Sequence, residues 1–267
     1  MTIGRRSFIR MAGLGSAAVC MHCLSAARAL AEAAHPTASG AQVAPHWSYA
    51  GNTGPDHWGE LQPDFKVCQL GLEQTPIDLN GGVKGELSAV TLDYKPLPLR
   101  ILNNGHTIQV NADAGSSCTI GGSKYDLLQF HFHHPSEHLL AGKAFDLECH
   151  FVHRASSGAL AVVGVFIKPG ARNAALAPLF DSMPAQEGPE RKVSGTIDPA
   201  ALVPKSSTYF RYMGSLTTPP CSEGLTWTVF KEPIEASSEQ IKQFAMLFSN
   251  NARPIQKQNR RFVIETN

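Results

Sequence analysis

Six of the eleven histidines in the chain lie between residues 127 and 154, in the segment LLQFHFHHPSEHLLAGKAFDLECHFVHR. Side chains two apart on a strand share a face, so His131 and His133 are expected to point the same way, about 7 Å apart. An antiparallel partner strand that turns near residue 142 would place His150 opposite His133. Three neutral imidazoles from two strands favour Zn²⁺ and leave the fourth tetrahedral position open.

Two neighbours on the same face are expected to orient these rings. Gln129 and Glu148 each lie two residues before a liganding histidine, so each can accept a hydrogen bond from the far ring nitrogen. Three other histidines have the wrong parity or lie in the connection, and we expect them to be hydrogen-bonded core or surface residues: His134, His138 and His153. A purely structural histidine cluster remains the alternative interpretation.

The elements that position these side chains are predicted to be mostly short strands. Runs rich in β-branched and aromatic residues, bounded by Gly, Pro and Asn, lie at 89–94, 106–112, 127–133, 147–153, 159–167 and 226–234. The run from Leu160 to Ile167 is apolar on both parities, which indicates a strand buried on both faces. Ser237 with Gln240 is typical of a helix start, and a shorter helix is expected within 173–180. The sequence therefore predicts a mainly β domain with peripheral helices.

The N-terminal residues are typical of an export signal. Residues 1–31 carry the twin arginines Arg5 and Arg6, a small and apolar run, and an A-x-A site, which predicts a Tat-type signal peptide. An amphipathic cytosolic helix is the alternative. Residues 32–45 are predicted to be a flexible lead-in, and 46–267 the domain. We therefore expect a periplasmic or secreted protein.

Composition limits the partners of the mature chain. Removal of residues 1–31 takes away four arginines and no acids, and it leaves 19 basic residues against 22 acidic ones. This balance does not suggest a nucleic acid or an anionic membrane as partner, and no membrane anchor is expected after the signal is removed. Four cysteines remain, which allow three complete pairings in an oxidising compartment.

Several motifs in the same order resemble an α-class carbonic anhydrase over nearly the whole mature domain. They are HWSY (46–49), PDHW (55–58), QTPI (74–77), NNGH (103–106), QFHFH (129–133), Glu148 with His150, SLTTPP (215–220) and TWTV (226–229). Ser48 departs from the glycine common at that place. The resemblance implies a large, twisted, mostly antiparallel central sheet with short peripheral helices. It also implies reversible hydration of CO₂ to bicarbonate and a proton, by zinc-bound hydroxide at the bottom of a cleft.

The resemblance further implies a role for individual residues. Zinc is expected on His131, His133 and His150, with the Thr217 hydroxyl donating to the carboxylate of Glu223. An apolar substrate pocket is implied for Val152, Val162, Leu216, Thr218 and Trp227. A proton shuttle is implied for His106, with Tyr49, Asn104 and Gln109 as polar residues of the proton path. A disulfide is implied for Cys68 and Cys221, which leaves Cys118 and Cys149 as free thiols.

Two other classes of protein remain open on the sequence. A non-catalytic binding module on the same fold would typically lack a zinc histidine, and a zinc-storage protein would not need the threonine or the apolar pocket. Small-molecule substrates, CO₂ and bicarbonate, are the expected partners, and a homodimer is one assembly that the sequence allows. Side activity on activated esters is expected from the same nucleophile.

Overall fold

The computed structural model describes residues 46–266, and the predicted signal peptide (1–31) and lead-in (32–45) lie outside the described residues. Within the described range, strands dominate. They are β1 Asp78–Leu79, β2 Val83–Lys84, β3 Thr91–Asp93, β4 Leu97–Asn103, β5 Ile108–Asn111, β6 Ser117–Ile120, β7 Ser123–His133, β8 Leu139–Leu140, β9 Leu147–Arg154, β10 Leu160–Pro169, β11 Arg191–Ile197, β12 Tyr209–Ser215, β13 Glu223–Phe230, β14 Ile234–Ala236 and β15 Ile264–Glu265. None of the described helices is long and apolar enough to cross a membrane.

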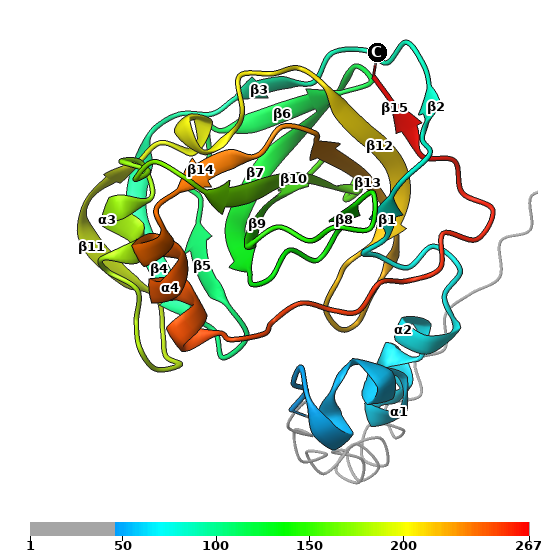
Figure 1. Cartoon of the computed structure of the whole chain (residues 1–267), viewed down its shortest axis with the longest axis horizontal. Helices are drawn as coiled ribbons and strands as arrows, with labels where there is room; N and C mark the ends of the chain where they lie inside the picture. Colours follow the sequence, from blue (N-terminus) through cyan, green and yellow to red (C-terminus); the bar gives the residue numbers. More distant parts are fainter. Residues whose placement is uncertain (1–45, 267) are drawn as a thin grey trace, which may run out of the picture. The chain divides into compact units, whose positions relative to one another are not determined.

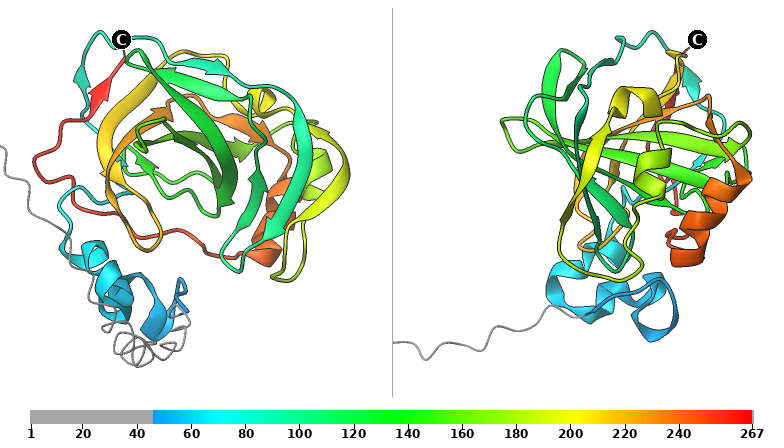
Figure 2. Two further views of the ribbon diagram at one scale, coloured as in Figure 1. Left: turned by 180° about the vertical axis from the view of Figure 1, so that it is seen from behind. Right: turned by 90° about the vertical axis from the view of Figure 1, so that its left-hand side faces the viewer.

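One large sheet forms the centre of the fold (Figures 1 and 2). Its strands follow the order β11-β4-β5-β7-β9-β10-β13-β12-β15-β2, with β14, β3 and β6 paired off this path. Most neighbours are antiparallel; the parallel pairs in this sheet are β10 with β13, β10 with β14, and β15 with β2. A second sheet pairs β1 with β8. The predicted fold class, a large and mostly antiparallel twisted sheet, is confirmed.

Strand β10 lies inside the sheet, as its composition predicts. It is bounded by β9 on one edge and by β13 on the other, and its residues 161–167 are all buried. Because both faces of this strand are covered, apolar side chains are required on both parities. The predicted strand at 226–234 is in fact two strands, β13 and β14. Pro233 lies in the break, and a proline has no backbone N–H to donate to a ladder.

The register between β7 and β9 differs from the predicted one by two residues. His131 lies opposite His150, and His133 lies opposite Glu148. The connection is not a simple hairpin, because its residues 139–140 form β8 against β1 and Leu140 bridges to Lys143. A shift of two residues keeps every side chain on its face, so the three histidines still share one side of the sheet.

The two faces of these strands carry different side chains. Phe130, Phe132 and Phe151 point into the main hydrophobic core with Cys149, whereas Val152, Val162 and Trp227 belong to a second apolar cluster. Alternation along β7 therefore buries aromatic rings on one face and presents histidines on the other. The histidines consequently lie on strands whose opposite face packs into the hydrophobic core.

Short helices lie outside the sheet. The helices are α1 Trp58–Leu61, α2 Val67–Leu70, α3 Ala177–Phe180 and α4 Ser238–Leu247, with 3-10 turns at Gly51–Thr53, Pro55–His57, Pro63–Phe65 and Pro199–Leu202. Ser237 caps α4 through a complete capping box with Gln240, which confirms the predicted start. Phe180 of α3 and Phe244 of α4 stack on each other, 6.2 Å apart, so the two helices cover the same part of the core.

A disulfide joins Cys68, in α2, to Cys221, just before β13. The implied pairing is thus confirmed, and Cys118 and Cys149 are free and buried. Next to the bond, Cys221 N donates to Thr218 O at 2.8 Å, and Leu216 N donates to Ser222 O at 3.0 Å. The loop at 216–222 is therefore closed by its own backbone and tied to the N-terminal helices.

Candidate active site

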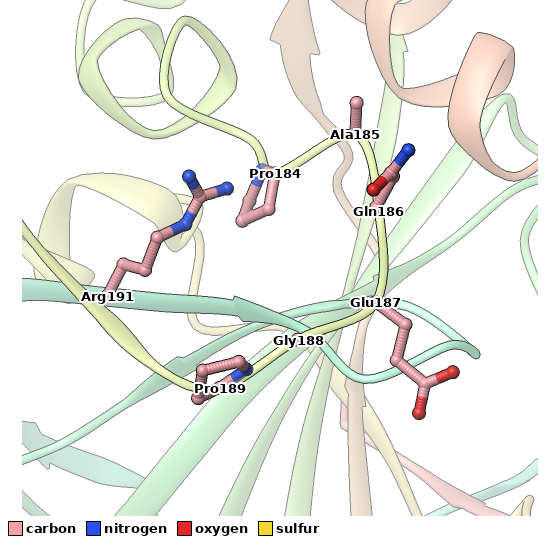
Figure 3. A pocket seen from close by; sticks show the side chains of 7 residues that line it. All are labelled: Pro184, Ala185, Gln186, Glu187, Gly188, Pro189 and Arg191. Carbon is pink, nitrogen blue, oxygen red and sulfur yellow. The ribbon is translucent and has the colours of Figure 1, made fainter.

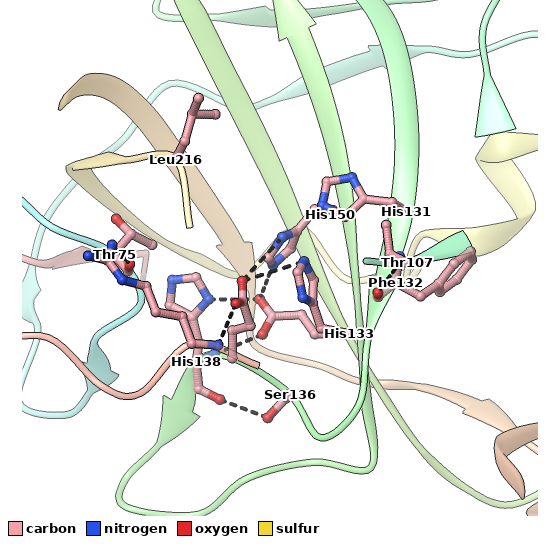
Figure 4. A network of polar contacts seen from close by, with 12 residues as sticks. Thr75, Thr107, His131, Phe132, His133, Ser136, His138, His150 and Leu216 are labelled. Carbon is pink, nitrogen blue, oxygen red and sulfur yellow. Dashed lines mark hydrogen bonds and ion pairs between the residues drawn. The ribbon is translucent and has the colours of Figure 1, made fainter. Parts of the chain in front are cut away.

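Three histidine rings converge from two adjacent strands (Figure 4). His131 and His133 come from β7 and His150 from β9, and one potential ligand nitrogen from each lies within 4.8 Å of the others. His131 Nδ1 donates to Gln129 Oε1 at 2.8 Å, and His133 Nδ1 donates to the carbonyl of Asn251 at 2.8 Å. His150 Nε2 lies 3.0 Å from Glu148 Oε1. These contacts leave His131 Nε2, His133 Nε2 and His150 Nδ1 for a common ligand.

The three rings fit a metal ion by their electrostatics as well as by position. Burial lowers the pKa of all three imidazoles, that of His133 to about 4, so they are neutral near pH 7. His133 Nε2 is buried and has no hydrogen-bond partner among the described residues. A buried nitrogen lone pair without a partner is costly unless a ligand takes it. The donor set therefore matches a divalent cation that prefers nitrogen.

A second group, His138, Glu148 and His150, forms a hydrogen-bond network behind the three converging rings. His138 Nδ1 donates to Glu148 Oε1 at 2.7 Å, and its backbone N–H donates to Oε2 at 2.9 Å. His138 Nε2 contacts Tyr212 Oη at 2.6 Å. Burial alone would raise the pKa of Glu148, but the two histidines outweigh it and hold this pKa well below its ordinary value. His138 is thus a hydrogen-bonded core residue, as expected.

The other two histidines set aside by parity are also hydrogen-bonded away from the site. His153 Nε2 accepts from Tyr94 Oη at 2.8 Å, and its Nδ1 donates to the carbonyl of Ala161 at 3.3 Å. His134 Nδ1 donates to the carbonyl of Ser249 at 2.9 Å. The alternation of side chains along the strands therefore places His134 and His153 apart from the three converging histidines, as expected.

The expected hydrogen bond from Thr217 to Glu223 is wrong. Glu223 Oε1 instead accepts from the backbone of Glu73 at 2.6 Å and from Gln74 Nε2 at 2.8 Å. The buried carboxylate beside Thr217 is Glu137: burial raises its pKa, and a hydrogen bond from the threonine hydroxyl opposes that rise. Because Glu223 begins β13 opposite Ser215, its side chain reaches the 71–74 loop rather than the site.

Glu137 lies deep in the same network. Burial raises its pKa to about 7, although His150, the backbone N–H of Arg253 and Thr217 act in the opposite direction. Arg253 N donates to Oε1 at 2.8 Å, and Oε2 lies 3.5 Å from His133 Nε2. A carboxylate is therefore held between the threonine loop and two of the converging histidines.

An apolar cavity of about 370 Å³ opens next to the rings. Its walls include all five residues expected there (Val152, Val162, Leu216, Thr218 and Trp227), together with Thr217 and the rings of His131 and His150. The Trp227 Nε1–H donates to the carbonyl of Ser215 at 2.9 Å, which fixes the indole against the threonine loop. Arg154 is the charged side chain in the lining, and the other walls next to the rings are mostly apolar, which suits a small uncharged molecule.

A polar cavity of about 100 Å³ lies on the other side of His131 and leads to His106. Tyr49, Asn104 and Gln109 line it, as expected, together with Gln129 and Thr218. The half-buried ring of His106 stacks on Trp47, with centroids 3.5 Å apart and planes 9° apart. Burial lowers the pKa of His106, and His46 adds to this effect. Polar groups thus connect the site with a titratable ring.

Sequence reasoning missed three residues that hold the site. Asn251 accepts from His133 through its carbonyl, and its side chain donates to the carbonyls of His106 and Phe132 at 2.9 and 3.0 Å. Glu137 and Trp47 were passed over as well. The signal for Glu137 was present, because an acid between His133 and His138 in a buried connection needs partners. No local pattern marks Asn251, whose backbone carbonyl and side chain both hold the site.

Comparisons with known proteins agree with this geometry. The family model for eukaryotic-type carbonic anhydrase matches residues 53–267. A carbonic anhydrase of Nostoc sp. is 47% identical over 226 residues, which cover 82% of this chain and 86% of that protein. The α-carbonic anhydrase from Thermovibrio ammonificans, solved with the inhibitor sulfanilamide, is 43% identical with a TM-score of 0.80, covering 82% of this chain and 99% of that one. The α-carbonic anhydrase of Photobacterium profundum is also 43% identical, with a TM-score of 0.78 over 82% of this chain and 100% of that one. The chain therefore belongs to the eukaryotic-type, or α-class, carbonic anhydrase family of enzymes.

Proposed function

We propose that this enzyme hydrates CO₂ reversibly with one Zn²⁺ on His131, His133 and His150, and that His106 carries the proton to solvent. The observation that carries the proposal is the convergence of three neutral imidazoles beside a mostly apolar cavity, each with its other nitrogen within 3.0 Å of a protein oxygen. When bound, zinc lowers the pKa of coordinated water to about 7 in carbonic anhydrases generally, which supplies a nucleophile near neutral pH.

Thr217 is proposed to orient that nucleophile. A hydroxyl has one proton, and donation of this proton to Glu137 leaves only lone pairs for a group in the cavity. Thr217 therefore accepts a hydrogen bond and selects a partner that still carries a proton. The loop that holds it is fixed by its backbone bonds and by the disulfide to Cys68.

The apolar walls are proposed to hold the substrate. CO₂ is small and uncharged, so contacts with Val152, Val162 and Leu216 bind it without costly desolvation of polar groups. Trp227 and Thr218 complete the pocket. Bicarbonate is charged and fits these walls poorly, which favours its release.

His106 is proposed to receive the proton left after each turnover. It lines the same polar cavity as His131 and His133, and Tyr49, Asn104 and Gln109 bring hydrogen-bonding groups to that cavity. An imidazole suits this task because it changes charge near neutral pH. The expected consequence is a turnover limited by proton transfer when buffer is dilute.

Residues 46–267 are proposed to form the catalytic domain, and residues 1–31 a Tat-type signal that directs the protein to the periplasm. The Cys68–Cys221 disulfide and the bacterial relatives are compatible with an exported protein. Replacing both Arg5 and Arg6 by lysine is expected to block Tat-dependent export. Appearance of that variant in the periplasm through the Tat route would remove this assignment.

The deciding experiment is stopped-flow CO₂ hydration by the purified protein as isolated, after chelation, and after addition of one equivalent of zinc. Activity that is lost on chelation and restored by zinc is expected. Tightly bound zinc without activity would instead favour a binding module on this fold. Rapid exchange of zinc at several sites per chain in equilibrium dialysis would favour storage. The shuttle is tested separately by His106→Ala, which should lower kcat in dilute buffer and recover with added imidazole.

A further inference from the structure

The loop at residues 184–188 is fixed against the turn that precedes His106. Both of its ends are tied to the buried Asn103 at the end of β4: Asn103 Nδ2 donates to the carbonyl of Pro184 at 3.0 Å, and Gly188 N donates to the carbonyl of Asn103 at 3.0 Å. The position of Glu187 is therefore set by the backbone of the loop.

The carboxylate of Glu187 lies directly over Gly105, the residue before His106. A Cβ built on Gly105 would be 2.9 Å from Glu187 Oε2 and 3.0 Å from its Cδ. Gly105 has φ +83°, so a side chain there would also strain the backbone. The close approach of the acid thus depends on a glycine at this position.

Among residues 46–266, no basic side chain forms an ion pair with this carboxylate. Figure 3 shows the Glu187 side chain directed away from Arg191 of the same loop. Glu187 takes part in none of the ion pairs found among residues 46–266. No ion pair among these residues therefore draws the carboxylate away from the turn that carries His106.

The groups around His106 act on its charge in opposite directions. Trp47 covers one face of the ring, and the ring of His46 lies 5.9 Å away. Burial and His46 both lower the pKa of His106, whereas Glu187 raises it. Glu187 is the acidic group that opposes the other two effects.

We propose that Glu187 is a positioning residue for proton transfer, whose carboxylate, placed over Gly105 by the anchored loop, stabilises the protonated ring of His106. The kinetic part of this inference rests on the proposed shuttle, whereas its electrostatic part needs only the geometry. His106 takes one proton from water in the site and passes it to buffer. A carrier works best when its pKa is close to that of its donor, and Glu187 counteracts the shift that burial imposes.

The test compares Glu187→Gln and Glu187→Lys with the zinc-loaded wild-type enzyme. Glu232→Gln is the control, because Glu232 is also exposed but lies between β13 and β14. The titration of the His106 ring is followed by NMR at low salt and at about 0.5 M salt, where the Debye length is only about 4 Å. In parallel, kcat and kcat/KM for CO₂ hydration are measured against pH in dilute buffer.

The titration midpoint of His106 is expected to move to lower pH in Glu187→Gln, further in Glu187→Lys, and not in Glu232→Gln. The proton-binding constant should fall by at most about fivefold in Glu187→Gln, the upper end for an exposed charge pair, and by less at high salt. The pH profile of kcat should follow, with kcat/KM unchanged.

A His106 titration that is the same in all variants would overturn the inference, whatever the kinetics show. A shifted titration with kcat unchanged in both Glu187→Gln and His106→Ala would overturn the proton-transfer role of both residues. The two failures are thus distinguishable, because the first concerns the field of Glu187 and the second concerns the shuttle.

Discussion

Replacement of Glu148 by glutamine is the sharpest test of the network behind the ligands. This carboxylate is completely buried and contacts two histidines: His138 donates to it twice, at 2.7 and 2.9 Å, and His150 Nε2 lies 3.0 Å from it. The substitution keeps the shape of the side chain and removes one charge. It also replaces one acceptor oxygen with an NH₂ group, which can only donate.

The expected loss follows from these contacts. If the amide oxygen stays towards the two rings, the new NH₂ faces the backbone N–H of His138, and an unsatisfied buried donor costs about 1–3 kcal/mol of folding free energy. Loss of the charged partner of a metal-binding histidine typically weakens metal affinity by about 10- to 100-fold. We therefore expect Glu148→Gln to fold with reduced stability and to bind zinc about 10- to 100-fold less tightly.

Two measurements separate these effects. Zinc affinity is obtained by competition with a chromophoric chelator, and the stability of the metal-free protein by urea unfolding. Glu86→Gln serves as the control, because Glu86 is exposed. Zinc affinity within about twofold of wild type, together with the expected loss of stability, would show that Glu148 supports the fold without orienting His150, and the reasoning would be refuted.

Three further outcomes are expected. Burial lowers the pKa of His153 to about 4, below its ordinary 6.5. The neutral ring's contribution to folding stability is therefore fully present above pH 6.5 and is lost as the pH falls from 6.5 towards 4. Between pH 6.5 and 4, the free energy of unfolding of the metal-free protein, measured in urea, should therefore fall by up to roughly 3 kcal/mol less in His153→Gln than in wild type. Equal decreases in the two proteins would contradict this. Replacing both Cys68 and Cys221 by serine should lower the free energy of unfolding by about 2–4 kcal/mol, and the denatured, unreduced mature chain should label at two thiols; four labelled thiols would contradict the bond. A Cβ at Gly164 would lie 3.1 Å from Glu148 Oε1 and 3.3 Å from Val229, so Gly164→Ala should cost about 1–3 kcal/mol and weaken zinc binding, whereas Gly188→Ala, with nothing within 4 Å, should not.

Hydrophobic periodicity in the sequence was sufficient to predict the strands that carry the site and the face on which each of their side chains lies. The alternation at 129–133 and at 148–152 assigned ligands and core residues to opposite faces, and the face assignment survived a register error of two residues. Other strands were hidden by their composition. Strand β4 contains Pro98, and the edge strand β11 is mostly polar and exposed, so neither gives the usual strand signal.

Contacts between segments far apart in the sequence were harder to predict than the face of the sheet on which a side chain lies. The resemblance implied Glu223 as the partner of Thr217, yet the carboxylate beside the threonine is Glu137, eighty residues earlier in the chain. The stacking of Trp47 on His106 and the bond from His133 to Asn251 likewise join segments with no pattern in common. The alternation pattern along a strand predicts on which side of the sheet a side chain lies. Which side chains contact each other depends on the packing of loops from other parts of the sequence.

The hydrogen bonds made by Asn251 and Arg253 also determine when the site can form during synthesis. These residues support His133 and Glu137 from the last part of a 267-residue chain, long after the strands with the histidines have left the ribosome. A nascent chain that stops short of them has the three rings but lacks the carbonyl and the N–H that hold the site from behind. The contacts behind the three rings are thus complete only once residues 251–253 have been made, and a product truncated before them should bind zinc weakly even if its strands have paired.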